Sequence, residues 1–240
     1  MELSKERPTE PVFLLRSTTW VVGCDLGQSN DPTAVCVLEW RKGALSLNSE
    51  WERHTRCDLL PEKPAERLVV RHLERLRLGM SYPEVVQEVK AILVRPPLDV
   101  PTTKLVIDET GVGRAVGDIF AQEGMRPERV TITAGSEETT APGFNRWSVA
   151  KQILVSKLDA ALHTRLLRIA KELRESGPLA EELRNFHRSI SAAGRQTYSA
   201  RVGMHDDLVL ATALAVWWAT RPAPAQPVFG TYGSTSINFI

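Results

Sequence analysis

The sequence predicts an α/β fold, a mixed sheet of five or more strands with helices on both faces, plus a small β-hairpin. Strand-like segments at 19–26, 32–40 and 67–77 come before most of the helical patterns, which favours antiparallel strands at the start of the chain. From residue 82 onward, helical and strand patterns alternate, which favours helices packed on a sheet.

The elements after residue 80 have local signatures. The strand expected over 104–108 is a continuous apolar run, as in a central strand buried on both faces. Gly111 and Gly113 mark the turn into the helix expected over 113–124. The last helix, expected over 206–220, is apolar on nearly every side and must be mostly buried. The other expected elements are a strand over 129–133, helices over 82–95, 147–162 and 178–187, and hairpin strands over 187–191 and 196–200.

A single folded domain is expected over 18–220, because 240 residues suffice for one large core. Residues 1–17 are polar and are expected to form a flexible tail or linker, and 221–240, which begin RPAPAQP, a flexible C-terminal tail. No apolar run reaches the roughly 18 residues of a membrane span. The chain also starts without a signal-peptide pattern, so the expectation is a cytoplasmic protein without a membrane partner.

Aspartates stand where apolar elements begin or end. Asp25 and Asp108 each end an apolar strand, and Asp206 and Asp207 open the last helix. Taken singly, such residues are usually turn formers or helix caps. In open α/β sheets, however, strand ends and helix starts converge at one edge, where several carboxylates would repel one another without a cation. The combination predicts a site for a hard divalent ion, Mg²⁺ or Mn²⁺.

Charge and cysteine content narrow the function further. The three cysteines lack a C-x-x-C spacing and the five histidines are scattered, which argues against zinc. The net charge is only +1, yet residues 146–201 hold 11 Lys and Arg against 5 Asp and Glu. This basic half either faces a phosphate backbone or is a solvated surface. On or beside the expected hairpin, Arg188, Arg195 and Arg201 are candidates for contacting DNA phosphates.

Several stretches resemble, in the same order, the C-terminal nuclease domain of the large terminase subunit of tailed bacteriophages, which has an RNase H-like fold. The stretches are VVGCDLGQSNDPTAVCVLEW, RHLERLRLGMSYPEVVQEVKAIL, LVIDETGVGRAVGDIF, KQILVSKLDAALHTRLLRIA, LAEELRNF and MHDDLVLATALA. DETGVG and the HDDL motif before an Ala-rich helix are the most specific. The resemblance implies a metal-dependent endonuclease that cuts concatemeric double-stranded DNA of a virus or prophage. It also implies hydrolysis of the phosphodiester bond with two Mg²⁺ or Mn²⁺ ions.

The resemblance assigns roles to particular residues. Asp25 and Asp108 match the first and second metal-binding carboxylates, and the third falls at Asp206 or Asp207. Asp207 aligns better and is the favoured ligand, with Asp206 as an outer-sphere or alternate ligand. Two basic residues are candidates to assist, Lys151 by neutralising a phosphate and His205 by carrying a proton, although ordinary helix-surface roles stay open for both.

The resemblance also implies partners in the host-cell cytoplasm. The chain has no G-x-x-x-x-G-K-[ST] phosphate loop, so it cannot translocate DNA alone and would work with a terminase ATPase domain, a small terminase subunit and a portal. Three alternatives remain. They are a Holliday-junction-resolvase-like nuclease, an actin- or sugar-kinase-like ATPase that uses DLGQSND and DETGVG as nucleotide loops, and a noncatalytic packaging-assembly module.

Overall fold

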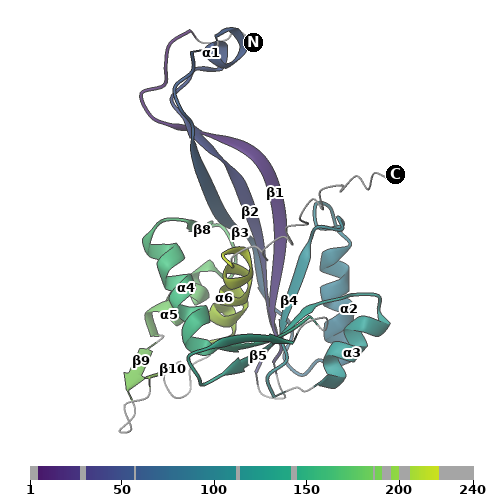
Figure 1. Ribbon diagram of the computed structural model, residues 1–240. Coiled ribbons are helices and arrows are strands. Elements are labelled where there is room, and N and C mark those ends of the chain that lie inside the picture. The colour runs from purple at the N-terminus through teal and green to yellow at the C-terminus, as the bar shows by residue number, and fades with distance from the viewer. Residues whose placement is uncertain are drawn as a thin grey trace, which may run out of the picture.

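The computed structural model describes residues 5–27, 31–56, 58–111, 114–141, 145–185, 187–190, 196–199 and 206–221. Ten strands and six helices are formed within them (Figure 1). The strands are β1 (Val12–Asp25), β2 (Ala34–Ser46), β3 (Lys63–Arg75), β4 (Lys104–Asp108), β5 (Glu128–Thr133), β6 (Glu138–Ala141), β7 (Arg146–Ala150), β8 (Leu167–Ile169), β9 (His187–Ile190) and β10 (Gln196–Ser199). The helices are α1 (Glu50–Thr55), α2 (Tyr82–Leu93), α3 (Arg114–Gln122), α4 (Lys151–His163), α5 (Ser176–Asn185) and α6 (Asp207–Ala219).

Eight strands form one mixed sheet in the order β6-β7-β5-β4-β1-β2-β3-β8, and β9 pairs with β10 as a separate hairpin. The pairs β1–β2 and β2–β3 are antiparallel, whereas β1, β4, β5 and β7 run parallel to one another. The predicted mixed sheet and hairpin are thereby confirmed. Because β1 and β4 are parallel neighbours at the centre of the sheet, their carboxyl ends reach the same edge.

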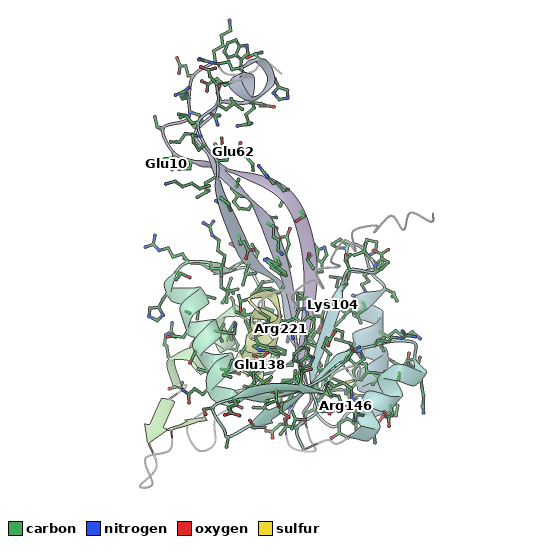
Figure 2. All side chains as sticks on the ribbon, in the orientation of Figure 1. Glu10, Glu62, Lys104, Glu138, Arg146 and Arg221 are labelled. Atoms are coloured by element: carbon green, nitrogen blue, oxygen red, sulfur yellow. The ribbon has the colours of Figure 1, made fainter. Side chains whose placement is uncertain are left out.

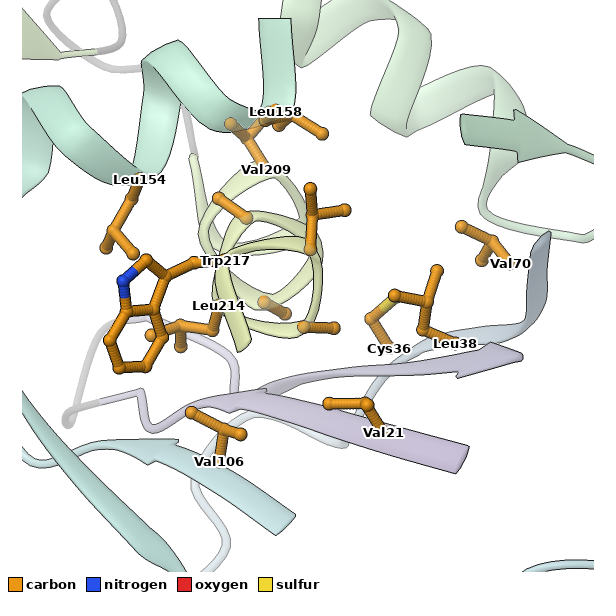
Figure 3. Close-up of a cluster of buried hydrophobic side chains, with 14 of the residues drawn as sticks. Val21, Cys36, Leu38, Val70, Val106, Leu154, Leu158, Val209, Leu214 and Trp217 are labelled. Carbon is orange, nitrogen blue, oxygen red and sulfur yellow. The ribbon is translucent and has the colours of Figure 1, made fainter. Parts of the chain in front are cut away.

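Helices cover both faces of the sheet, as predicted, and each face has its own core. On one face, α6 lies between the sheet and α4. Figure 3 shows Val209, Leu214 and Trp217 of α6 beside Leu154 and Leu158 of α4. The other core lies under α2 and α3 and includes Val22, Val37, Val86, Val89, Ile107 and Phe120. Because α6 is buried on almost every side, its apolar composition follows from its place in the core.

The glycine at position 23 sets the distance between α6 and β1. A Cβ built on Gly23 would lie 2.1 Å from the carbonyl oxygen of Ala211 and 3.0 Å from the nitrogen of Ala215. The helix backbone therefore packs directly on the strand, with only small residues between them. Since Gly23 is two residues from Asp25, this contact brings the start of α6 to the sheet edge where β1 ends.

The far end of α6 is anchored by a group of tryptophans. Trp147 of β7 meets Trp217 and Trp218 edge to face, with ring centroids 5.8 and 5.9 Å apart. The guanidinium of Arg221 lies over the rings of Trp218 and Trp147, at 3.8 and 4.0 Å from their centroids. In Figure 2, Arg221 and Glu138 lie close together; Glu138 accepts a hydrogen bond from Trp217 Nε1 at 2.9 Å. These contacts fix the orientation of the helix.

Strands β1, β2 and β3 continue beyond the helices as a long ribbon, with α1 at its far end (Figure 1). A capping box between Ser49 and Glu52 starts α1, and Arg7 Nε donates to Glu52 Oε1 at 2.8 Å. The ribbon moves the expected domain boundary. Residues 12–17, expected within a flexible tail, belong to β1, because their backbone pairs with β2 out to Ser46.

The remaining differences from the sequence-based expectations concern short elements. The helix expected over 147–162 is divided, since 146–150 form β7 and α4 begins only at Lys151. Trp147 and Val149 suit a strand better than a helix, which explains the difference. Helix α1 and strands β6 and β8 were not expected. In the described part of the chain, no helix combines the length and apolar character needed to span a membrane.

Candidate active site at the edge of the sheet

Asp25 and Asp108 lie side by side at the carboxyl ends of β1 and β4. They are Cα partners in the parallel ladder, which places them on adjacent strands roughly 4.8 Å apart. The residues just before the acids, 21–24 of β1 and 105–107 of β4, are buried, so the chain delivers the two acids to the edge where the apolar runs stop. Asp108 is buried, with 7% of its surface exposed, and Asp25 is half-buried.

The electrostatics of this pair indicate an excess of negative charge. Burial raises the pKa of Asp108 to about 6, although hydrogen bonding from Thr110 opposes the shift. Burial, followed by the charges of Asp108, Asp206 and Asp207, raises the pKa of Asp25 well above its usual value, and Lys151 opposes this shift. A cation bound at this edge would relieve the repulsion.

Hydrogen bonding leaves ligand capacity on both acids. Oδ1 of Asp108 accepts a hydrogen bond from the Thr110 backbone nitrogen at 2.8 Å, which orients the carboxylate. No residue in the described ranges donates a hydrogen bond to the carboxylate of Asp25. Half-buried carboxylates normally have such partners, so Asp25 is suited to receive a ligand.

The start of α6 contributes two further carboxylates with different partners. Asp206 precedes the first residue of α6, but its side chain makes no capping hydrogen bond. Instead, Oδ2 of Asp206 accepts from Lys151 Nζ at 2.7 Å. Lys151 is the first residue of α4, directly after β7. The structure thus brings one of the two predicted assisting residues to the site.

Asp207 is held by Arg75, which the sequence did not suggest. Arg75 Nε donates to Asp207 Oδ2 at 2.7 Å, and Nη2 donates to Oδ1 at 3.3 Å. The same guanidinium pairs with Glu182 and, at 3.4 Å, with Glu175. Burial and Asp207 raise the pKa of Glu182 to about 7 despite this cation, because one arginine faces three carboxylates.

Glu182 also fixes the first turn of α6, since its Oε2 accepts from the Val209 backbone nitrogen at 3.0 Å. Arg75 and Glu182 therefore position the helix start that carries the acids. Arg75 ends β3 opposite Ala34, whose partner on β1 is Asp25. The only sequence signal was a charged residue at a strand end.

Other predicted residues are less informative. His205, Arg195 and Arg201 lie outside the described residues, and Arg188 belongs to β9. Cys24, next to Asp25, is a free buried cysteine; burial, followed by the charges of Asp25 and Asp108, raises its thiol pKa, so it is unsuited to be a thiolate ligand.

The side chains at this edge suit a hard divalent cation, because such ions prefer carboxylate oxygens. The carboxylates are those of Asp25, Asp108, Asp206 and Asp207. Across the described ranges, however, no three His, Cys, Asp or Glu side chains already converge as a metal site. Ion pairs account for this separation of the acids. Lys151 holds Asp206 and Arg75 holds Asp207, while Asp25 and Asp108 lie next to each other.

A family model described as the terminase RNaseH-like domain matches residues 67–217, more than half of the chain. The chain belongs to this family. The matched range of this terminase RNaseH-like domain includes Asp108, Asp206 and Asp207 and begins after Asp25. The suspected resemblance to the nuclease domain of terminase large subunits is confirmed at the level of the family.

Solved structures agree with the fold of this terminase RNaseH-like domain. The cobalt-bound large terminase nuclease of thermophilic phage G20c has a TM-score of 0.55 and 21% identity, with 89% of this chain and 90% of that chain covered. Its magnesium-bound form has a TM-score of 0.54 and 19% identity, with coverages of 89% and 85%. The large terminase nuclease domain of Thermus phage P74-26 has a TM-score of 0.52 and 19% identity, with coverages of 82% and 78%. No curated protein matches the chain.

Proposed function

We propose that this protein is a divalent-metal-dependent DNA endonuclease of a phage or prophage packaging terminase. The observation that carries the proposal is the Asp25 carboxylate, half-buried without a hydrogen-bond donor among the described residues and adjacent to Asp108. Such a pair gains most from a hard cation. Membership in the terminase RNaseH-like family, and the cobalt and magnesium bound in two similar structures, support a metal-dependent nuclease.

Three carboxylates would hold two Mg²⁺ or Mn²⁺ ions: Asp25, Asp108 and one acid at the start of α6. We assign the third role to Asp206 in preference to Asp207, because both oxygens of Asp207 accept hydrogen bonds from Arg75. The charge of Asp206 also raises the pKa of Asp25 more than the charge of Asp207 does. Asp207 then acts through Arg75 to hold α6 in place.

Bound ions would lower the pKa of a water molecule and neutralise charge on the leaving 3′-oxygen. The protein's own residues prepare the site for that chemistry. Thr110 orients the carboxylate of Asp108, and the packing of α6 on Gly23 sets the position of Asp206. Lys151 neutralises Asp206 in the metal-free protein and is suited to contact a substrate phosphate once cations bind the acids.

The substrate we propose is double-stranded DNA, and the partners a terminase ATPase domain, a small terminase subunit and a portal. The junction-resolvase and assembly-module alternatives make different predictions. A resolvase prefers branched over linear duplexes, and an assembly module folds without cutting DNA under any metal condition. Membership in a terminase family supports packaging over the ATPase alternative.

The decisive experiment follows nicking of supercoiled plasmid with Mg²⁺, Mn²⁺ or EDTA. It compares the wild type with Asp108→Asn and with Asp159→Asn, an exposed acid on α4 that serves as a matched control. We expect metal-dependent nicking in the wild type and in Asp159→Asn, and none in folded Asp108→Asn. If the folded wild type does not cut with either metal, the proposed nuclease activity is wrong for the isolated chain.

A further inference from the structure

A second charged surface lies along the same sheet, away from the carboxylates. It consists of four arginines on three neighbouring strands: Arg41 on β2, Arg67 and Arg71 on β3, and Arg168 on β8. We call this group the arginine patch. Arg168 belongs to the basic segment 146–201 and lies in strand β8.

Strand pairing places the patch on one face of the sheet. Arg41 and Arg67 are Cα partners, and Arg168 is the partner of Val69, two residues further along β3. Residues two apart on a strand share a face, so these three side chains do as well. At the alternating positions, Leu68 and Val70 belong to the core under α6. The patch therefore lies on the opposite face, where Arg168 and Arg71 are exposed.

Neighbouring side chains hold three of the guanidinium groups in place. Buried Glu39 accepts hydrogen bonds from Arg41 Nε at 2.8 Å and from Arg71 Nε at 2.6 Å. Burial alone would raise the pKa of Glu39, but these two arginines lower it, so the carboxylate stays charged. The guanidinium of Arg67 lies over the ring of Phe13, 4.3 Å from its centroid. The patch is thus organised before any ligand binds.

Positive charge in the patch is not balanced. Glu39 offers one carboxylate to Arg41 and Arg71. As far as the chain is described, neither Arg67 nor Arg168 has an ion-pair partner. Burial and, after it, the charges of Arg168 and Arg41 lower the pKa of Arg67, which indicates mutual repulsion. An anion with several charges would remove that repulsion.

We propose that the arginine patch binds the phosphate backbone of the duplex that is cut at the carboxylate edge. This inference rests on the proposed nuclease function. Guanidinium groups match the oxygen geometry of phosphate better than ammonium groups do. The patch spans three strands, about 10 Å. Measured along the axis of a duplex, that width corresponds to roughly three base-pair steps of about 3.4 Å.

The separation between patch and site also fits duplex DNA. Arg41 pairs with Thr18, seven residues along β1 from Asp25. At about 3.3 Å per residue the separation is roughly 23 Å. This is shorter than one helical turn of B-DNA, about 34 Å. A duplex of two turns is therefore longer than this separation along the strand, whereas a duplex of half a turn is shorter.

The test measures binding of a fluorescein-labelled duplex of two helical turns by anisotropy, in EDTA, over a range of salt concentrations. The variant is Arg67→Gln/Arg168→Gln. The matched control is Lys104→Gln/Arg126→Gln, which removes two exposed cations near the opposite end of β4 (Lys104 in Figure 2). A thermal melt checks that each variant is folded. Because EDTA prevents metal-dependent cutting, a failure of the nuclease proposal does not affect this measurement.

We expect the patch variant to bind the long duplex roughly tenfold more weakly and to lower the slope of log affinity against log salt by about two. We expect the control variant to change affinity less than about twofold. The half-turn duplex should bind the wild type and the patch variant with equal affinity. Unchanged affinity and slope in the folded patch variant would overturn the proposal. So would tighter binding of a polyglutamate peptide than of DNA, lost in the variant, which would indicate an acidic protein partner.

Discussion

Arg75 holds both carboxylate oxygens of Asp207, from a position 132 residues earlier in the chain. This contact separates two adjacent acids that look equivalent in the sequence. The side chain of Asp207 is 6% exposed and bound to an arginine, whereas the side chain of Asp206 is 27% exposed and bound to a lysine. We infer that Asp207 mainly supports the helix and that Asp206 faces the ligand.

The two acids should therefore respond differently to substitution. Asp207→Asn should lower the free energy of unfolding by about 1–3 kcal/mol, because a partly buried arginine loses one of its charged partners. Asp206→Asn should leave stability nearly unchanged and abolish metal-dependent plasmid nicking. Urea unfolding and the nicking assay measure the two effects. Full nicking by Asp206→Asn would return the third ligand to Asp207.

The raised pKa of Asp108, about 6, predicts a pH-dependent stability difference. Its ordinary value is 3.8, so between about pH 4 and 6 the folded protein binds more protons at Asp108 than the unfolded chain does. Stability from this group is thus lost as pH rises through that window, by up to about 3 kcal/mol.

In the absence of metal, the Asp108→Asn substitution removes the free-energy cost of ionising this carboxyl in the folded protein. We expect the variant to match the wild type near pH 4 and to exceed it by up to about 3 kcal/mol at pH 7, in urea unfolding with EDTA. A variant less stable than the wild type at pH 7 would contradict the unfavourable environment of the carboxylate. The contrast is useful because the stabilised variant is also the one expected to lose cleavage.

Metal addition should reverse the repulsion at the edge. At pH 7, Mn²⁺ at about 100 times its dissociation constant should stabilise the wild type by about 2.7 kcal/mol. Asp25→Asn should lose most of this gain, since Asp25 adjoins Asp108 in the ladder. Melting temperatures with Mn²⁺ and with EDTA measure the effect. Equal shifts in both proteins would place the metal elsewhere.

Gly23 offers a test of how α6 is positioned. Gly23→Ala would place a Cβ 2.1 Å from the Ala211 carbonyl oxygen, which forces the helix away from β1. We expect a loss of about 1–3 kcal/mol in the free energy of unfolding, together with reduced nicking. Gly177→Ala is the matched control, because no atom lies within 4 Å of the added Cβ and the residue is helical. Similar behaviour of the two variants would contradict the close packing.

The sequence predicted the parts of the site that have local signatures. Asp25 and Asp108 follow apolar runs. The apolar composition of α6 predicted a buried helix that starts at an acid pair. Parallel strands then place the first two acids together, which general rules of α/β sheets anticipate. The family resemblance added the order of the elements.

Other features depend on partners far along the chain. The contact of Arg75 with Asp207 joins a strand end to a helix start, and no local sequence pattern predicts it. Residues 12–17, VFLLRS, are a different case, because they carry an apolar strand signal of their own that the interpretation of 1–17 as a polar tail missed. Strands β6 and β8 have only four and three residues and owe their form to neighbouring strands.

The carboxylate edge draws on almost the whole length of the chain: β1 supplies Asp25, β4 supplies Asp108, and α6, the last described helix, supplies Asp206 and Asp207. The same helix is the centre of the larger core, so the first strand and the last helix depend on each other. During synthesis, the acids cannot meet until α6 has left the ribosome. A chain that ends before α6 therefore lacks the assembled carboxylate edge, and the proposed cutting would require the protein to be complete through α6.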